Sequence, residues 1–239
     1  MNGIRAVFID IDNTLLSFDG YVKQTMKTGF DHFGLKKYED WMSDVFFRIN
    51  NGLWEAIERE ELTFEELKKV RWNKVFKELG INFEGPVFET YFRKELNSSA
   101  IPMEGAQELV RYLSGRYILC AASNGPYEQQ VNRLRIAGML PYFHDVYVSE
   151  NIGSPKPTEE YFRECMKRLN ESLSADPGMK EITPGEVMMI GDSFTSDMAG
   201  GVTFGMKTCL YNFKGKKVPE DSGINHTVTS LADIPGMIL

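Results

Sequence analysis

Seven polar residues in this 239-residue sequence have the side chains needed to bind a metal ion and an anion together. Each lies at or soon after the end of a short apolar run, and they fall in four separate segments. They are Asp10, Asp12, Ser123, Asn124, Lys156, Asp192 and Asp197. Carboxylates supply the oxygen ligands that Mg²⁺ prefers. A lysine and a hydroxyl can neutralise and hydrogen-bond an anion such as a phosphate group.

The four segments meet only if the fold brings distant parts of the chain together. Apolar runs predict buried strands at residues 4–9, 117–122, 145–148, 187–190 and 207–211. Helical patterns lie between them, at residues 104–113, 127–137, 158–169 and 195–204. This alternation predicts an α/β fold with a doubly wound (Rossmann-like), mostly parallel sheet, in which ligands bind at the carboxyl ends of the strands. The polar segments are therefore expected at one edge of the sheet.

Residues 16–97 interrupt this alternation. They contain no convincing strand and show four amphipathic helical patterns, at residues 21–33, 39–57, 63–79 and 87–95. Thr63 and Glu66 have the spacing of a capping box at a helix start. We therefore predict a core domain of residues 1–15 plus 98–239, with a helical domain of residues 16–97 inserted after the first strand.

The composition excludes several classes of partner. Hydrophobic residues make up 42% of the chain, enough for a sizeable core, and the formal net charge of −7 argues against a nucleic acid polymer. No apolar run approaches the roughly 18 residues of a membrane span, and the start of the sequence lacks a signal-peptide pattern. Three isolated cysteines fit reduced thiols. We expect a cytoplasmic monomer or homodimer.

The polar segments resemble, in order, the four motifs of the haloacid dehalogenase (HAD) superfamily. The matching stretches are Asp-Ile-Asp-Asn-Thr at 10–14, Ser-Asn-Gly at 123–125, Lys-Pro at 156–157 and Gly-Asp-(four residues)-Asp at 191–197. The helical insertion corresponds to a cap domain in that superfamily. Within it, Asn-Asn-Gly-Leu-Trp-Glu-Ala-Ile-Glu at 50–58 is similar to a stretch of its bacterial pyrimidine 5′-nucleotidases. The resemblance implies a phosphatase acting on a small phosphorylated metabolite, with a pyrimidine nucleoside 5′-monophosphate as the closer expectation.

The resemblance also implies catalytic roles. Asp10 is the expected nucleophile, which forms an aspartyl-phosphate. Asp12 is the expected general acid and base, and its presence favours phosphoryl transfer because the dehalogenases of the superfamily lack it. Lys156 is expected to neutralise Asp10 and the phosphate. Ser123, through its hydroxyl, and Asn124, through its backbone N–H, are expected to bind the phosphate.

The expected cofactor is Mg²⁺. Its ligands, by the same resemblance, are the carboxylate of Asp10, the backbone carbonyl of Asp12 and the carboxylate of Asp192. Asp197 is expected to hold metal-bound waters or to orient Lys156.

Three other functions remain open on the sequence. A sugar-phosphate or phosphoglycolate phosphatase and a phosphomutase would share all the core residues. A non-catalytic module that binds a phosphorylated ligand would share their placement, although four intact catalytic positions argue against it. Aromatic residues of the helical domain could stack on a nucleobase or form its core. They are Phe18, Trp41, Trp54 and Trp72.

Overall fold

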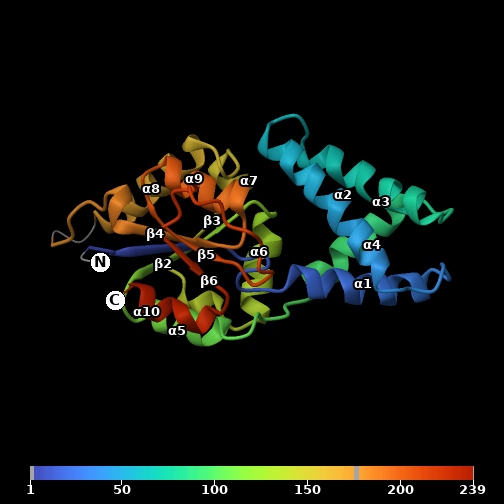
Figure 1. Ribbon diagram of the computed structural model, residues 1–239, viewed down its shortest axis with the longest axis horizontal. Helices are drawn as coiled ribbons and strands as arrows, with labels where there is room; N and C mark the ends of the chain where they lie inside the picture. Colours follow the sequence, from blue (N-terminus) through green and yellow to red (C-terminus); the bar gives the residue numbers. More distant parts are fainter. Residues whose placement is uncertain (1–2, 175–177, 239) are drawn as a thin grey trace. The chain divides into compact units, whose positions relative to one another are not determined.

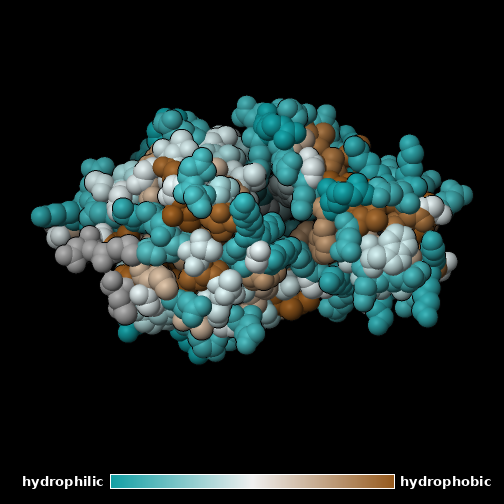
Figure 2. Space-filling model, in the orientation of Figure 1, coloured by the Kyte–Doolittle hydropathy of each residue, from teal (hydrophilic) through white to brown (hydrophobic). Residues whose placement is uncertain are grey.

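A computed structural model of the protein describes residues 3–174 and 178–238. The chain divides into two compact units, one formed by Met1–Ser17 with Pro102–Leu239 and the other by Phe18–Ile101. Figure 2 shows hydrophilic residues over most of the visible surface of both units, in keeping with a charged fraction of 26%. Within the described ranges, no helix combines the length and the apolar character needed to cross a membrane.

The first unit is built on a six-stranded sheet in which all neighbouring strands are parallel, in the order β3-β2-β1-β4-β5-β6. This confirms the predicted doubly wound sheet. The strands are β1 (Ala6–Ile9), β2 (Ile118–Ser123), β3 (Asp145–Val148), β4 (Val187–Gly191), β5 (Lys207–Tyr211) and β6 (His226–Val228). Strand β6 was not predicted, because its three residues, which begin with a histidine, are too few to show an apolar run.

Helices cover both faces of the sheet: α8 and α9 lie on one face, and α5 and α10 on the other (Figure 1). The helices of this unit are α5 (Ala106–Ser114), α6 (Tyr127–Ile136), α7 (Ser149–Ile152), α8 (Glu159–Leu173), α9 (Ala199–Thr203) and α10 (Ile234–Ile238). The continuous helix predicted at 195–204 is instead a π-helical turn, Phe194–Met198, followed by α9. The hydroxyl of Ser193 accepts the Ser196 N–H at 3.2 Å and so caps this turn.

The strand order places a topological switch point beside the first polar segment. From β1 the chain adds β2 and β3 on one side, then returns to add β4, β5 and β6 on the other. Ile9 is in register with Ala121 of β2 and with Ile190 of β4. The residues that follow these three positions therefore lie next to each other, at the edge where such sheets bind ligands.

The second unit contains four helices, α1 (Phe18–His32), α2 (Trp41–Glu58), α3 (Phe64–Leu79) and α4 (Gly85–Asn97). Their buried faces form a largely aromatic core that includes Phe46, Trp72 and Phe92. Phe18 packs against this core, its ring centroid 6.4 Å from that of Phe46 and 6.3 Å from that of Phe92. For Phe18 and Trp72 the structure thus favours the core role over nucleobase stacking.

Polar contacts fix the helices of this unit. The predicted capping box is confirmed: Thr63 Oγ1 accepts the Glu66 N–H at 3.2 Å, and Glu66 Oε2 accepts the Thr63 N–H at 2.9 Å. Inside the core, Arg71 of α3 donates to both carboxylate oxygens of Glu89 of α4, at 3.1 and 2.7 Å. The same guanidinium donates to Asn50 Oδ1 of α2 at 2.9 Å. One buried ion pair therefore links three helices.

Candidate active site

A buried lysine holds two of the predicted carboxylates together. Asp10 follows β1 directly, and its backbone N–H donates to the Ile190 carbonyl at 2.8 Å. The Lys156 ammonium is 1% exposed and donates to Asp10 Oδ1 at 2.9 Å, to Asp197 Oδ1 at 2.6 Å and to the Ala122 carbonyl at 2.7 Å. An ammonium has three donors. All three are used, so the lysine is fixed in place as a counter-ion.

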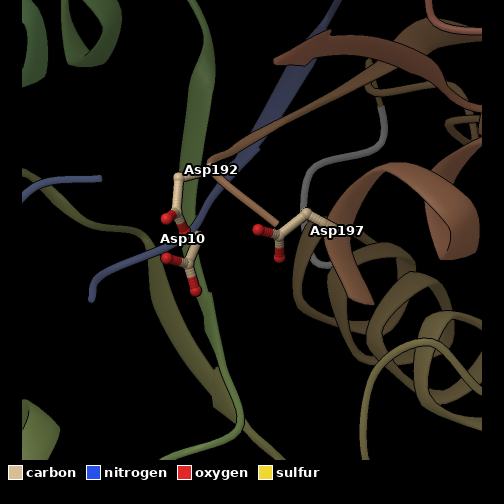
Figure 3. A group of neighbouring side chains, drawn as sticks. All are labelled: Asp10, Asp192 and Asp197. Atoms are coloured by element: carbon tan, nitrogen blue, oxygen red, sulfur yellow. The ribbon is translucent and has the colours of Figure 1, made fainter. Parts of the chain in front are cut away.

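A third carboxylate completes the cluster. Asp10, Asp192 and Asp197 each place a carboxylate oxygen so that all three atoms lie within 4.8 Å of one another, and their side chains converge in Figure 3. The backbone N–H of Ser193 donates to Asp197 Oδ2 at 3.1 Å. A Cβ at position 191 would lie 2.1 Å from that same oxygen, so the glycine of the fourth motif makes room for Asp197.

The charges of this cluster are unbalanced. Burial raises the pKa of Asp10 to about 7, with Lys156 acting to lower it and the charge of Asp197 adding to the rise. Burial, followed by the charges of Asp10 and Asp197, raises the pKa of Asp192 well above its ordinary value. Although burial disfavours the Lys156 ammonium, the carboxylates of Asp10 and Asp197 raise its pKa. When all three acids ionise, the single lysine leaves two negative charges in excess.

These residues fit a divalent cation. The donors are all carboxylate oxygens, the ligands that suit Mg²⁺ and Mn²⁺ and not the softer metals. A charge of +2 would neutralise the excess that Lys156 leaves. None of the three cysteines, all buried elsewhere, belongs to the cluster. The structure thus brings together Asp10, Asp192, Asp197 and Lys156 among the predicted residues.

Asn124 makes a contact that the sequence analysis did not anticipate. Its side chain brackets the backbone of Lys156: Oδ1 accepts the Lys156 N–H at 2.8 Å, and Nδ2 donates to the Lys156 carbonyl at 2.9 Å. The prediction concerned only the backbone N–H of Asn124 and a phosphate. Because the two residues are 32 positions apart, no local pattern signals this pairing.

Asp12 and Ser123 lie in a second polar cluster, together with two residues of α6. Gln130 Nε2 donates to Asp12 Oδ2 at 2.6 Å and to Ser123 Oγ at 2.8 Å. Arg133 donates from one nitrogen to Asp12 Oδ1 at 2.6 Å and to Gln130 Oε1 at 2.9 Å. Gln130 and Arg133 were not among the predicted site residues. The sequence does place them three residues apart on a predicted helix directly after the second motif, which puts both side chains on the same face of that helix.

Comparison with known proteins identifies the family. A sequence profile described as "Hydrolase: haloacid dehalogenase-like hydrolase" matches residues 4–205. The protein YfnB of Bacillus subtilis (strain 168), named as a HAD-hydrolase, is 32% identical over 221 residues, which cover 92% of this chain and 89% of YfnB. A crystal structure of YfnB bound to magnesium superimposes with a TM-score of 0.87, at 27% identity and 99% coverage of both chains.

Two nucleotidases are also similar over most of their length. The pyrimidine 5′-nucleotidase PynA of Streptococcus pneumoniae is 27% identical over 87% of this chain and 84% of its own. The pyrimidine 5′-nucleotidase YjjG of Escherichia coli (strain K12) is 25% identical over 97% of this chain and 96% of its own. The motifs, the sheet and the family profile agree: the chain belongs to the haloacid dehalogenase-like hydrolase family.

Proposed function

We propose that this hydrolase is a Mg²⁺-dependent phosphatase that hydrolyses a pyrimidine nucleoside 5′-monophosphate through an aspartyl-phosphate at Asp10. The observation that carries the proposal is the buried cluster in which Asp10 contacts Lys156 and lies beside Asp192. A carboxylate can attack a phosphate dianion only if positive charge screens the repulsion between them. This cluster has one such charge in place and the ligands for a second.

The reaction proceeds in two steps on the residues of this chain. In the first, a carboxylate oxygen of Asp10 bonds to phosphorus as the ester bond breaks, and Asp12 gives a proton to the departing oxygen. In the second, Asp12 takes a proton from water, whose oxygen bonds to phosphorus as the bond to Asp10 breaks. The Ser123 hydroxyl holds a phosphate oxygen throughout. The positive charge of Lys156, whose N–H groups stay on Asp10, Asp197 and the Ala122 carbonyl, offsets the repulsion between the nucleophile and the phosphate.

Asp10, Asp192 and the backbone carbonyl of Asp12 are the proposed ligands of Mg²⁺, with Asp197 orienting Lys156 through the 2.6 Å contact described above. When bound, the ion supplies further positive charge that offsets the repulsion between the nucleophile and the phosphate.

The substrate proposal is supported by PynA and YjjG, the relatives named as pyrimidine 5′-nucleotidases. A sugar phosphate is the second candidate, because the glyceraldehyde 3-phosphate phosphatase of Methanopyrus kandleri is 31% identical over 86% of this chain and 82% of its own. Dehalogenases that superimpose with a TM-score of 0.77 are only 15–16% identical and show the fold alone.

We further propose that the helical unit, predicted as residues 16–97, is a cap domain that selects the substrate. The proposal is supported by the insertion of this unit directly after the segment that contains Asp10 and Asp12. The magnesium-bound YfnB structure is described as revealing interdomain movement in that protein.

Phosphate release from a substrate panel tests the proposal. The panel contains pyrimidine and purine nucleoside 5′-monophosphates, hexose phosphates, glyceraldehyde 3-phosphate, phosphoglycolate and p-nitrophenyl phosphate, each with Mg²⁺ and with a chelator. We expect the highest kcat/KM with a pyrimidine monophosphate and no turnover in chelator. A preference for glyceraldehyde 3-phosphate would establish the second candidate. Full activity in chelator would refute the role of the metal ion.

A further inference from the structure

The polar cluster around Asp12 contains a buried arginine, Arg133, in the core unit. Arg133 is 1% exposed and Gln130 is fully buried, yet both side chains point from α6 to the loop after β1. The carboxylate of Asp12, in contrast, is 32% exposed. The helix therefore contacts the residue that the proposed function makes the general acid and base.

Packing gives no reason for an arginine at this position. Burying a guanidinium is costly, and apolar replacements of buried ion pairs are often neutral or stabilising. The Nε of Arg133 finds no hydrogen-bond partner among the described residues, which adds to this cost. A leucine or methionine would serve a purely structural helix better. The contact with Asp12 is what the arginine provides.

The hydrogen bonds define one orientation for each group in the cluster. Gln130 Oε1 accepts from Arg133, so its Nε2 faces the Asp12 carboxylate and the Ser123 hydroxyl. Arg133 binds one oxygen of Asp12 and Gln130 binds the other, which prevents the carboxylate from rotating. Each carboxylate oxygen has two lone pairs, so a lone pair on each remains available for a proton.

The second motif is shaped to admit Gln130. A Cβ at Gly125 would lie 2.5 Å from Gln130 Nε2, so a side chain there would displace the amide. Ser123, which the proposed function places on the substrate phosphate, is thereby joined through one amide to Asp12. The two groups that must act on opposite ends of the breaking bond are held by the same side chain.

We propose that Arg133 and Gln130 are positioning residues that hold the Asp12 carboxyl group in line with the departing oxygen. The inference rests on the proposed function, in which Asp12 protonates that oxygen. General acid catalysis contributes about 10²- to 10⁴-fold, and it matters most for leaving groups that are strongly basic. A misplaced Asp12 should therefore slow the release of an alkoxide far more than the release of an acidic phenol.

The leaving-group dependence of kcat/KM tests the inference. This parameter includes only the steps up to formation of the aspartyl-phosphate, so the later hydrolysis does not affect it. Wild type, Arg133→Met and Arg133→Lys are compared on an alkyl phosphate, p-nitrophenyl phosphate and 2,4-dinitrophenyl phosphate. For Arg133→Met we expect a loss of about 100-fold on the alkyl ester and less than about tenfold on the dinitrophenyl ester. Arg133→Lys, which keeps the charge, should lose less.

Two further variants separate positioning from folding. Gln130→Met removes the second contact to Asp12 without leaving an unpaired charge, and it should show the same selective loss if Arg133→Met does not fold. Arg135→Gln is the matched control, since Arg135 is an exposed residue of the same helix whose guanidinium contacts Asn132. It should match wild type on all three esters. Each variant should retain the rise in Tm that Mg²⁺ gives to wild type.

Equal losses on the three esters, or no loss in either variant, would overturn the inference while leaving the proposed function intact. A wild-type enzyme that hydrolyses none of the esters with Mg²⁺ would overturn both. The two failures are thus distinguished by the wild-type activity.

Discussion

Each unit of this protein contains a buried cation bound to carboxylates, and the two differ in their balance of charge. In the helical unit, Arg71 meets one carboxylate, that of Glu89, through two hydrogen bonds. In the core unit, Lys156 meets two, those of Asp10 and Asp197, and the carboxylate of Asp192 lies beside them. The first set is neutral. The second retains an excess of negative charge.

On the function proposed above, this difference in charge separates a structural ion pair from a catalytic one. The guanidinium of Arg71 also stacks over the ring of Phe92, 4.8 Å from its centroid, so its charge is neutralised and stabilised by residues of its own unit. The core cluster, once its acids are ionised, keeps an excess of negative charge that a further cation would offset. An excess of like charge destabilises a fold, and proteins retain it where binding or catalysis requires it.

The largest expected effect is on turnover. Asp10→Asn removes the proposed nucleophile and should lower kcat by about 10⁴-fold or more, or roughly 5 kcal/mol in the barrier. Because Lys156 keeps its contacts with Asp197 and the Ala122 carbonyl, the Tm should equal or exceed that of wild type. Steady-state assays on p-nitrophenyl phosphate, together with thermal unfolding, measure both. Residual activity above one-hundredth of wild type would contradict the role of Asp10.

In the helical unit we expect a large loss of stability and little change in turnover. Glu89→Gln leaves Arg71 buried without a counter-charge and should lower the free energy of unfolding by about 3–5 kcal/mol. At temperatures where the variant is folded, kcat on p-nitrophenyl phosphate should stay within about twofold, since Glu89 pairs with Arg71 inside the helical unit and is none of the proposed catalytic residues. Urea unfolding and the same assay test this expectation.

The double variant Arg71→Met/Glu89→Leu is the control for that experiment. It removes the pair without leaving a single buried charge, so it should recover most of the lost stability. A double variant as unstable as the single one would mean that the ion pair itself, rather than its unpaired remainder, holds the three helices.

The contrast also shows which features the sequence could reveal. Short apolar runs predicted five of the strands, and the polar segments that follow them include all the residues of the carboxylate cluster. Both features are local properties of the chain. Arg71, Gln130 and Arg133 were not singled out. Each lies on a helix where a polar residue is ordinary, and only the fold shows that its side chain is buried.

Contacts between residues far apart in the sequence were not predicted for the same reason. The two hydrogen bonds between the Asn124 side chain and the Lys156 backbone join loops 32 positions apart, and no periodicity of the sequence encodes them. The π-helical turn at Phe194–Met198, which the side chain of Ser193 caps, replaces the regular helix that the apolar pattern predicted. Motif spacing indicated which residues matter, and tertiary contacts decided what each one touches.

A smaller effect is expected from the metal ion itself. Mg²⁺ should stabilise the wild type by about 2.7 kcal/mol at a concentration one hundred times its Kd, if it binds only the folded state. Asp192→Asn should abolish this gain, whereas Asp44→Asn, the same change at an exposed position of α2, should keep it. Thermal unfolding across a Mg²⁺ titration measures the difference. An unchanged gain in Asp192→Asn would remove that residue from the metal site.

The smallest expected effect is the pH dependence of that stabilisation. The pKa of Asp10 is about 7 in the folded protein without metal against an ordinary value of 3.8, so the folded state holds the proton more tightly than the unfolded state. The stability of the metal-free protein should therefore fall as pH rises from about 4 to about 7. Mg²⁺ competes with this proton and binds the ionised form. The Mg²⁺-induced rise in Tm should be larger at pH 8 than at pH 5.5, and the difference should shrink in Asp10→Asn, where no proton is displaced at that position. Equal rises at the two pH values would show that the excess negative charge does not govern metal binding.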